Sequence, residues 1–291
     1  MPSLREFNER LASMASMRRV TSTMKLVAGS HLHRVQSDLS RPEQFTRDLA
    51  ALIPILQQPR FAQHRLLQPP PEKGSRILLV TMSADRGLCG GFNAAVVRAV
   101  REFHAAHEER AAKIDHLYIG QKAYNTLKGE YPGILDHVLP ASSHPSVADS
   151  DRVAKRVMRV FSWKMYDEVW LISNHFVNSM TNDCRTERLL PDARPPVPKV
   201  QADPMPLPRL IEPNDERLLE NLVYLWIQLS LYYAMLHSAT GELAARVMAM
   251  NNSTMNLNAM EKELRTRRNR ARQAAITNEL TEIVSGAEAL K

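Results

Sequence analysis

The loop Ser83–Asn93, SADRGLCGGFN, holds the residues of this sequence that most resemble a chemical site. It follows an apolar run and opens an amphipathic stretch, which is where phosphate-binding loops occur. However, it contains neither Gly-Lys-Ser/Thr nor GxGxxG, and no Lys or Arg after the glycines could meet terminal phosphates. We therefore expect Gly87, Gly90 and Gly91 to supply positive φ and close packing in a strand-to-helix turn, with no cofactor bound.

Two other groups of side chains have types that could do chemistry. Cys89 would be a nucleophile if the helix N-terminus stabilised its thiolate, but no His or acidic partner lies nearby in sequence, so a packed turn is favoured. His104, His107 and Glu108 could share one helix face as metal ligands. Without a third clear partner, a solvated helix surface is the favoured interpretation. No catalytic or metal-binding residue is therefore assigned.

A basic cluster near the C-terminus has two interpretations. Against Glu261 and Glu263 it carries six positive charges, on Lys262, Arg265, Arg267, Arg268, Arg270 and Arg272. It is either a solvated face or a collar that attracts an acidic protein surface. The formal net charge of +7 also suggests nucleic-acid binding as a function. Against this, no aromatic residues interleave with the basic ones and no nucleic-acid-binding module is visible.

Composition narrows the class of protein. The chain has 291 residues, of which 44% are hydrophobic and 24% charged, as in ordinary soluble proteins. Two cysteines are too few for a disulfide framework or a cysteine-based zinc site, which favours a reducing bacterial cytoplasm. No apolar run approaches the ~20 residues that span a bilayer, so we expect no direct membrane insertion. The N-terminus lacks the apolar segment of a signal peptide.

The middle of the chain predicts a mainly parallel α/β domain at residues 74–190, because strands alternate with helices. The strands are expected at 76–83, 115–120 and 168–176, with an added edge strand at 185–190. Helices are expected at 92–112, 121–130 and 147–167. Eight of the 18 prolines then fall between Pro191 and Pro213, which predicts an extended link at 191–213.

The two ends of the chain predict long helices. A proline-free run follows Pro213, so residues 214–291 form one helix that would be roughly 110 Å long at 1.5 Å per residue. Apolar residues recur in it at helical spacing, up to Ala271, Ala275 and Ile283. At the N-terminus the same spacing runs through Leu4, Phe7, Leu11, Met14, Met17, Val20, Met24, Val27 and Val35. Pro42 would break this N-terminal segment, and a second helical piece would follow at 43–53. Residues 1–58 would then cover the C-terminal helix in a long antiparallel two-helix coiled coil.

Three stretches together resemble the gamma subunit of F-type ATP synthases: residues 18–34, the loop DRGLCGGFN, and the C-terminal RARQAAITNELTEIVSGA. The resemblance covers about Leu4 to Leu290. It implies a non-catalytic central shaft that turns inside a ring of alpha and beta subunits and docks, with the epsilon subunit, on the membrane c ring. It also implies a peripheral place on the cytoplasmic side of the bacterial inner membrane. Shaft orientation would bias the catalytic sites and so couple ion flow to ATP synthesis or hydrolysis.

The resemblance also implies which residues contact other subunits. Met24 and Lys25 match positions beside the lever of the beta subunit, and Arg246 matches an arginine associated with coupling. Arg272, Gln273 and Thr277 match positions that contact the inner loops of the catalytic ring.

The chain departs from the family pattern at several positions. Ser22 and Thr23 stand where Lys and Ala are typical, His31 stands where Lys is common, and Asn251 and Met255 replace Lys and Asp. A divergent or second-copy rotary ATPase is a hypothesis that follows from these departures.

Two other classes of protein stay open from the residues alone. One is a free-standing nucleotide-dependent α/β enzyme with helical extensions, which would bind ATP tightly. The other is a basic coiled-coil adaptor for nucleic acid, which would bind DNA with a steep salt dependence.

Overall fold

A computed structural model describes residues 3–39, 64–66, 68–135, 139–191 and 215–288 of the chain. The chain divides into two compact units, one made of Met1–Ala28 with Arg246–Lys291 and the other of Gly29–Ala245. The helical piece expected at 43–53 and the extended link at 192–214 lie outside the described residues.

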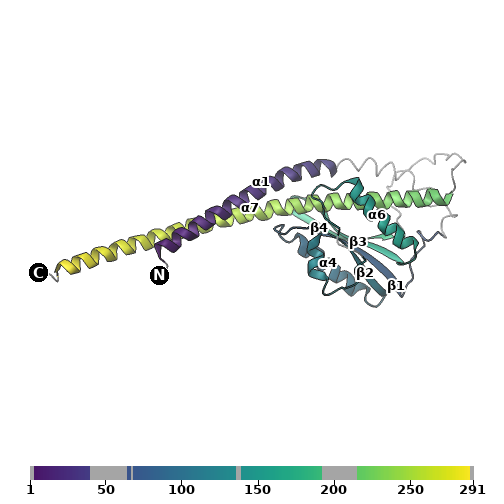
Figure 1. The fold of residues 1–291 in the computed structure, drawn as a ribbon, viewed down its shortest axis with the longest axis horizontal. Helices are drawn as coiled ribbons and strands as arrows, with labels where there is room; N and C mark the ends of the chain where they lie inside the picture. Colours follow the sequence, from purple (N-terminus) through teal and green to yellow (C-terminus); the bar gives the residue numbers. More distant parts are fainter. Residues whose placement is uncertain (1–2, 40–63, 67, 136–138, 192–214, 289–291) are drawn as a thin grey trace. The chain divides into compact units, whose positions relative to one another are not determined.

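A four-stranded sheet forms the centre of the second unit, with strand order β2-β1-β3-β4 (Figure 1). The strands are β1 (Ser75–Met82), β2 (Ala111–Ile119), β3 (Glu168–Asn178) and β4 (Thr181–Leu190). β1 pairs in parallel with β2 and β3, and β4 pairs antiparallel with β3. The expected mainly parallel α/β sheet with an added edge strand is confirmed.

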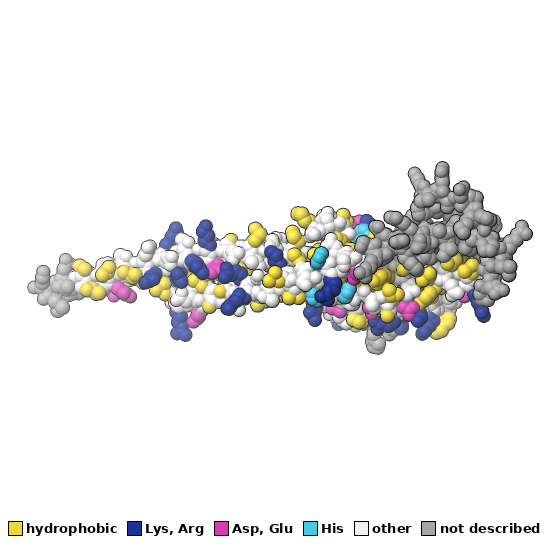
Figure 2. Space-filling model, turned by 90° about the horizontal axis from the view of Figure 1, so that it is seen from above, with side chains coloured by type: hydrophobic (Ala, Val, Ile, Leu, Met, Phe, Trp, Pro, Cys, Tyr) yellow, Lys and Arg dark blue, Asp and Glu magenta, His cyan; other side chains and the backbone are white. Residues whose placement is uncertain are grey.

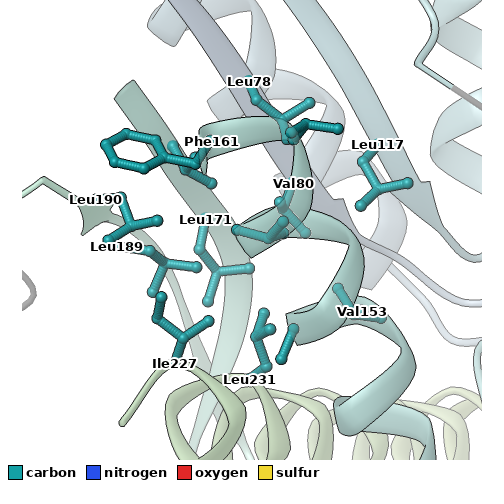
Figure 3. Packing of buried hydrophobic residues seen from close by; sticks show 14 of the residues in the cluster. Leu78, Val80, Leu117, Val153, Phe161, Leu171, Leu189, Leu190, Ile227 and Leu231 are labelled. Carbon is teal, nitrogen blue, oxygen red and sulfur yellow. The ribbon is translucent and has the colours of Figure 1, made fainter. Parts of the chain in front are cut away.

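Helices cover both faces of this sheet, because β1 is apolar on both sides. Ile77 and Leu79 face α4 (Phe92–His107) and α5 (Gln121–Leu127). Leu78 and Val80 face α6 (Val147–Ser162) and the first third of the C-terminal helix. Figure 3 shows this second core, in which Val153 of α6 and Ile227 and Leu231 of the C-terminal helix point toward the sheet residues Val80 and Leu171. The result is a three-layer arrangement of helices, sheet and helices.

The two long terminal helices are α1 (Leu4–Leu39) and α7 (Asp215–Glu288). α7 is continuous over 74 residues, as the proline-free run predicts. In the second unit, every residue of α7 from Ala234 to Ala244 is buried. The β3–β4 hairpin contacts this buried stretch: Phe176 N–H donates to Nδ1 of His237 at 3.2 Å, and Nδ2 of Asn182 donates to the carbonyl of Gly241 at 3.1 Å.

In the first unit, α1 and α7 contact each other through polar side chains. Thr21 Oγ1 lies 2.9 Å from Thr254 Oγ1, and Lys25 Nζ donates to Asn251 Oδ1 at 2.8 Å. Arg18 lies 3.7 Å from Glu261. Residue numbers rise along α1 as they fall along α7, so the two helices run in opposite directions where they touch.

Several expected boundaries of the central elements were wrong. α4 ends at His107 instead of 112 and β2 begins at Ala111, because pairing of Ala111 with Ser75 extends the sheet. α6 ends at Ser162 instead of 167, since Lys164 adopts φ of 56° and closes the last turn by donating to the Phe161 carbonyl at 3.0 Å. β4 begins at Thr181 rather than 185, and α5 ends at Leu127 rather than 130.

The apolar residues expected to line the α1 seam are only partly in it. Phe7 is buried, but Met17, Val20 and Val27 are 50%, 55% and 54% exposed. The expectation for these three was wrong because the polar contacts of Thr21 and Lys25 hold a neighbouring face of α1 against α7. Ile283 of α7, expected in the same stripe, is also exposed.

Gly120, between β2 and α5, should tolerate no side chain. Its φ is 94°, and a Cβ there would collide with the Ser83 carbonyl. We expect Gly120→Ala to lower the free energy of unfolding by at least about 2 kcal/mol, through both backbone strain and overpacking. Gly129→Ala is the matched control, since a Cβ at that position meets nothing within 4 Å. Equal urea midpoints for the two variants would contradict the argument.

A pair of histidines, His116 buried and His104 half-buried, should make the second unit sensitive to acid. Nε2 of His104 lies 3.0 Å from Nε2 of His116, and the two rings stack at 5.1 Å between centroids. Burial, with a smaller contribution from the neighbouring His104, lowers the pKa of His116 to about 4, and burial also lowers the pKa of His104. Protons therefore bind the unfolded chain first, so stability should fall as the pH drops from about 6.5 to about 4.

The variant His116→Phe keeps a stacking ring but removes this titration. It should reduce the slope of unfolding free energy against pH in that window by up to about 1.4 kcal/mol per pH unit. Urea unfolding at several pH values measures the slope, with His33→Phe on the exposed side of α1 as control. An unchanged slope in His116→Phe would show that the pair does not govern acid sensitivity.

Candidate functional site

The first candidate site lies where the order of the strands changes direction. β2 lies on one side of β1 and β3 on the other, so the carboxyl ends of β1 and β3 form a topological switch point. Open parallel sheets bind ligands at such points. The loop Ser83–Asn93 leaves β1 there and leads into α4.

Side chains of the protein itself fill this position. Ala84, Cys89 and Phe92 form a small buried cluster, against which Ala245 of α7 packs. Asn93 accepts a hydrogen bond from the Ala84 N–H at 2.9 Å and donates to Cys89 Sγ at 3.1 Å. The side-chain amide of Asn93 is therefore bonded within the loop rather than turned towards a ligand.

Two further side chains hold the loop to its surroundings. Ser83 Oγ accepts from the Ala123 N–H at 3.1 Å, and Asp85 accepts from the N–H groups of Gln121 and Ala141, each at 3.1 Å. The only carboxylate of the loop is therefore already hydrogen-bonded to backbone. A general acid or base at this position would need a carboxylate that faces solvent or substrate.

The backbone of the loop follows the expected turn only in part. Gly90 has φ of 57°, as expected for a glycine that supplies positive φ. Gly91 has φ of −80° as the residue before α4, and Gly87 is not among the positive-φ glycines, so that part of the expectation was wrong. Leu88 adopts φ of 65° instead and is 62% exposed.

Cys89 has the environment of a packed residue. Its side chain is 1% exposed and its sulfur accepts from Asn93, which confirms the packed-turn interpretation. Cys184, the other cysteine, is on β4, and burial raises the pKa of its thiol to about 11. Neither thiol is set up as a nucleophile, which requires a stabilised thiolate.

The histidines of α4 do not lie on a solvated surface, so the favoured interpretation of that face was wrong. His104 stacks on Tyr131 at 3.8 Å between centroids, and His107 stacks on Phe103 at 4.0 Å. His116, which sequence reasoning missed, completes the cluster from β2. Within the described ranges no three His, Cys, Asp or Glu side chains gather in a way that could hold a metal ion.

The residues that the resemblance assigns to subunit contacts lie on α1 and α7 of the first unit. Met24 and Lys25 are half-buried, and Lys25 bonds to Asn251. Arg246 is half-buried at the start of the α7 segment of this unit. Arg272, Gln273 and Thr277 are exposed, and the Thr277 hydroxyl donates to the Gln273 carbonyl at 3.0 Å. The structure brings Lys25 next to Asn251, a residue that had been noted only as a departure.

The basic cluster of α7 is mostly exposed and only partly neutralised. Glu261 pairs with Arg265 at 2.6 Å, and Glu263 pairs with Arg267. Among the described residues no carboxylate pairs with Lys262, Arg270 or Arg272. Figure 2 shows Lys and Arg side chains gathered along this unit, beside hydrophobic side chains that face outward. Such a surface suits an acidic partner with apolar patches.

α7 also exposes an apolar stripe near its C-terminal end. Ile276, Leu280, Ile283 and Val284 are 46%, 58%, 68% and 56% exposed and follow helical spacing. Exposed apolar stripes of this kind mark contact surfaces in soluble proteins. Among the described helices, none combines the length and apolarity that crossing a bilayer requires.

Comparisons with known proteins agree on one family. A family profile described as ATP synthase matches residues 3–290. Curated relatives called ATP synthase gamma chain come from Geotalea uraniireducens (32% identical over 292 residues), Geobacter metallireducens (33% over 304) and Rhodospirillum rubrum (32% over 302). In each case 100% of both chains is covered.

Solved structures give the same result. A chain from the central stalk and c ring of the Tetrahymena thermophila mitochondrial ATP synthase matches with a TM-score of 0.62 and 26% identity, over 80% of this chain and 98% of that one. A chain from the Euglena gracilis mitochondrial ATP synthase matches in fold with a TM-score of 0.67 at 18% identity, over 99% of this chain and 94% of that one.

The filled switch point predicts that the full-length chain does not bind ATP. Isothermal titration of the purified chain with Mg-ATP should give no saturable heat, whereas a phosphate-loop protein titrated under the same conditions gives a stoichiometric transition. Tight stoichiometric binding by this chain would favour the nucleotide-dependent enzyme instead.

Proposed function

Because the chain belongs to the ATP synthase gamma family, we propose that it is the central rotor shaft of an F-type ATP synthase. It transmits rotation between the ion-translocating c ring and the catalytic head of alpha and beta subunits, and so couples ion flow to ATP synthesis or hydrolysis. One observation carries this function: the chain matches gamma chains over their full length, and it contains one helix of 74 residues.

For the shaft, we propose that α1 and α7 form an antiparallel coiled coil. Hydrogen bonds between Thr21 and Thr254 and between Lys25 and Asn251 support this pairing. Buried or half-buried residues of α1, joined by the exposed Arg18 that contacts Asn258, include a series with steps of three and four residues, as a heptad seam requires. The proposed organisation is a coiled coil from residues 1–58 and 214–291, an α/β domain at 74–190 and a link at 191–213.

We propose that the subunit itself is non-catalytic. The place where an open α/β sheet binds its ligand is filled by Cys89 and Phe92 with Ala245 packed against them. The catalytic sites then belong to the surrounding subunits, and the shaft acts on them by favouring some of their conformations over others.

The surface of the first unit fits the proposed partners. The unneutralised charges of Lys262, Arg270 and Arg272 suit acidic surfaces of the alpha and beta subunits. The apolar stripe from Ile276 to Val284 suits an enclosing apolar sleeve. With the epsilon subunit and the c ring as its other partners, the chain is a peripheral subunit of a membrane-bound complex. We place that complex at the bacterial inner membrane, with this chain on the cytoplasmic side.

Six residues are proposed to make the contacts that transmit rotation: Met24, Lys25, Arg246, Arg272, Gln273 and Thr277. The exposed positions of Arg272 and Gln273 leave their side chains available to a surrounding ring. Lys25 is already bonded to Asn251, so its proposed contact with the beta subunit would involve the outer side of its ammonium group.

Co-expression tests the proposed function directly. The chain is produced with the alpha and beta subunits of its own complex, and the purified assembly is assayed for ATP hydrolysis. A complex that contains this chain and drives ion pumping in vesicles carrying the c ring is expected. Failure of the chain to associate with alpha and beta subunits would overturn the proposal.

The double variant Arg272→Ala with Gln273→Ala tests the contact residues. It should weaken assembly or coupling, while the free energy of unfolding changes by no more than about 0.5 kcal/mol, because both side chains are exposed. Ion-driven ATP synthesis by the reconstituted complex measures coupling. Arg98→Ala on the exposed side of α4 is the control and should keep wild-type synthesis. Wild-type synthesis by the double variant would count against the assigned role.

A further inference from the structure

The contact between α1 and α7 contains a polar layer where an apolar one is usual. We define the polar layer as Arg18, Thr21 and Lys25 of α1 together with Asn251, Thr254, Asn258 and Glu261 of α7. Its bonds are Thr21 to Thr254 at 2.9 Å, Lys25 to Asn251 at 2.8 Å, and Arg18 to Asn258 at 3.4 Å and to Glu261 at 3.7 Å. Every member on α7 has a partner on α1.

The polar layer occupies regular heptad positions. Arg18, Thr21 and Lys25 contact α7. They continue a series of buried or half-buried residues on α1 that advances by alternating steps of three and four: Leu4, Phe7, Leu11, Met14, then Arg18, Thr21, Lys25 and Ala28, of which only Arg18 is exposed. This is the spacing of a left-handed coiled-coil seam. The seam is therefore apolar up to Met14 and polar from Arg18 to Lys25.

A second stripe on α1 has the same spacing but is apolar. Met17, Val20, Met24 and Val27 also advance by three, four and three residues, one position before the seam residues. Three of these four side chains are at least half exposed. This apolar stripe would be the better seam by hydrophobicity alone, yet Met17, Val20 and Val27 are left exposed and only Met24 is half-buried.

A local change of winding would exchange the two stripes. The steps from Met14 to Met17 and on to Val20 are both three residues, which is a stammer in the heptad pattern. A stammer overwinds a helix locally within a coiled coil. The apolar stripe thus becomes continuous with Phe7, Leu11 and Met14 if α1 overwinds between Met14 and Val20.

The polar residues of α7 explain why the overwound seam is not used. Asn251, Thr254 and Glu261 stay at the contact whichever face α1 presents. Opposite an apolar face they would lose their partners on α1, while Thr254 would keep its bond to the Met250 carbonyl and Glu261 its pair with Arg265. Loss of hydrogen-bond partners at a packed contact is costly. The polar residues of α7 are thus stabilised at the contact by the polar residues of α1, and those of α1 by the polar residues of α7.

We propose that α1 carries two alternative seams for α7, and that the polar layer selects the heptad seam over the overwound apolar one. The segment from Met14 to Val27 is then a two-state element whose balance is set by Asn251 and Thr254. This inference concerns pairing within the chain and does not rest on the proposed function.

Cysteine labelling tests the proposal on the full-length chain. Val20→Cys is introduced after Cys89→Ala and Cys184→Ala, and its rate of reaction with a maleimide reports exposure of the apolar stripe. Asn251→Leu with Thr254→Leu removes two of the four polar residues that α7 contributes to the polar layer, leaves Asn258 and Glu261 in place, and leaves α1 otherwise unchanged. Labelling of Val20→Cys should then fall about tenfold, since about nine in ten molecules would bury that position.

Two controls separate a seam change from a general effect. Asn252→Leu makes the same substitution at a neighbouring exposed position of α7 and should leave labelling unchanged. Ser22→Cys, which is exposed on α1, should stay reactive in the double variant. Adding Val27→Gln to the double variant places a polar side chain in the apolar stripe and should raise labelling of Val20→Cys again.

Undiminished labelling of Val20→Cys in the double variant would overturn the proposal, as would a fall that Val27→Gln does not reverse. If circular dichroism shows that the double variant does not fold, Thr254→Leu alone is measured in the same way. A smaller but reversible fall is expected there, and no fall would again overturn the proposal.

Discussion

The structure depends on the burial of one helix, α7, in two different surroundings. Leu219, Ile227 and Leu231 have no exposed surface and complete the core on one face of the sheet. From Arg246 onward the same helix belongs to the other unit and contacts α1. In proteins most of the stability of a helix comes from tertiary packing, so the continuity of α7 rests on these packing partners. Both units are therefore built around the same backbone.

Much of this organisation could be predicted from the sequence because it depends on periodicity. The apolar run at 77–80 is buried on both faces, and a run of that kind predicts a central parallel strand. The absence of proline after Pro213 predicts a single helix. Boundaries were less accurate: Ala111 was expected in the helix, but pairing with Ser75 of β1 draws it into β2. Sheet pairing is a long-range effect that local preference does not contain.

In the candidate site, too, features that depend on local sequence pattern could be predicted, and features that depend on contacts between distant residues could not. The glycine-rich turn could be located from the sequence, but not that Leu88 rather than Gly91 takes a positive φ. The histidine cluster could not be foreseen, because His104 and His116 come from different elements and meet only in the fold. On α1, hydrophobicity pointed to Met17 and Val20, whereas hydrogen bonds across the helix pair placed Thr21 at the contact. The signal that would have identified Thr21 is the strict alternation of three and four residues. The assignment of Arg272 and Gln273 as contact residues rests on the resemblance alone, since no contact within the chain distinguishes them from other exposed residues.

The glycine at position 241 has a mechanical consequence for α7. Glycine in the middle of a helix weakens resistance to bending, because its backbone is the least restricted. Asn182 of the β3–β4 hairpin lies where a side chain at 241 would be, and it donates to the Gly241 carbonyl. The hairpin thus braces the turn of α7 that contains Gly241. The stiffness of α7 at that turn therefore depends on the β3–β4 hairpin, which lies almost sixty residues earlier in the chain. Substitutions in the hairpin should then change how easily α7 bends, although the sequence of α7 itself is unchanged.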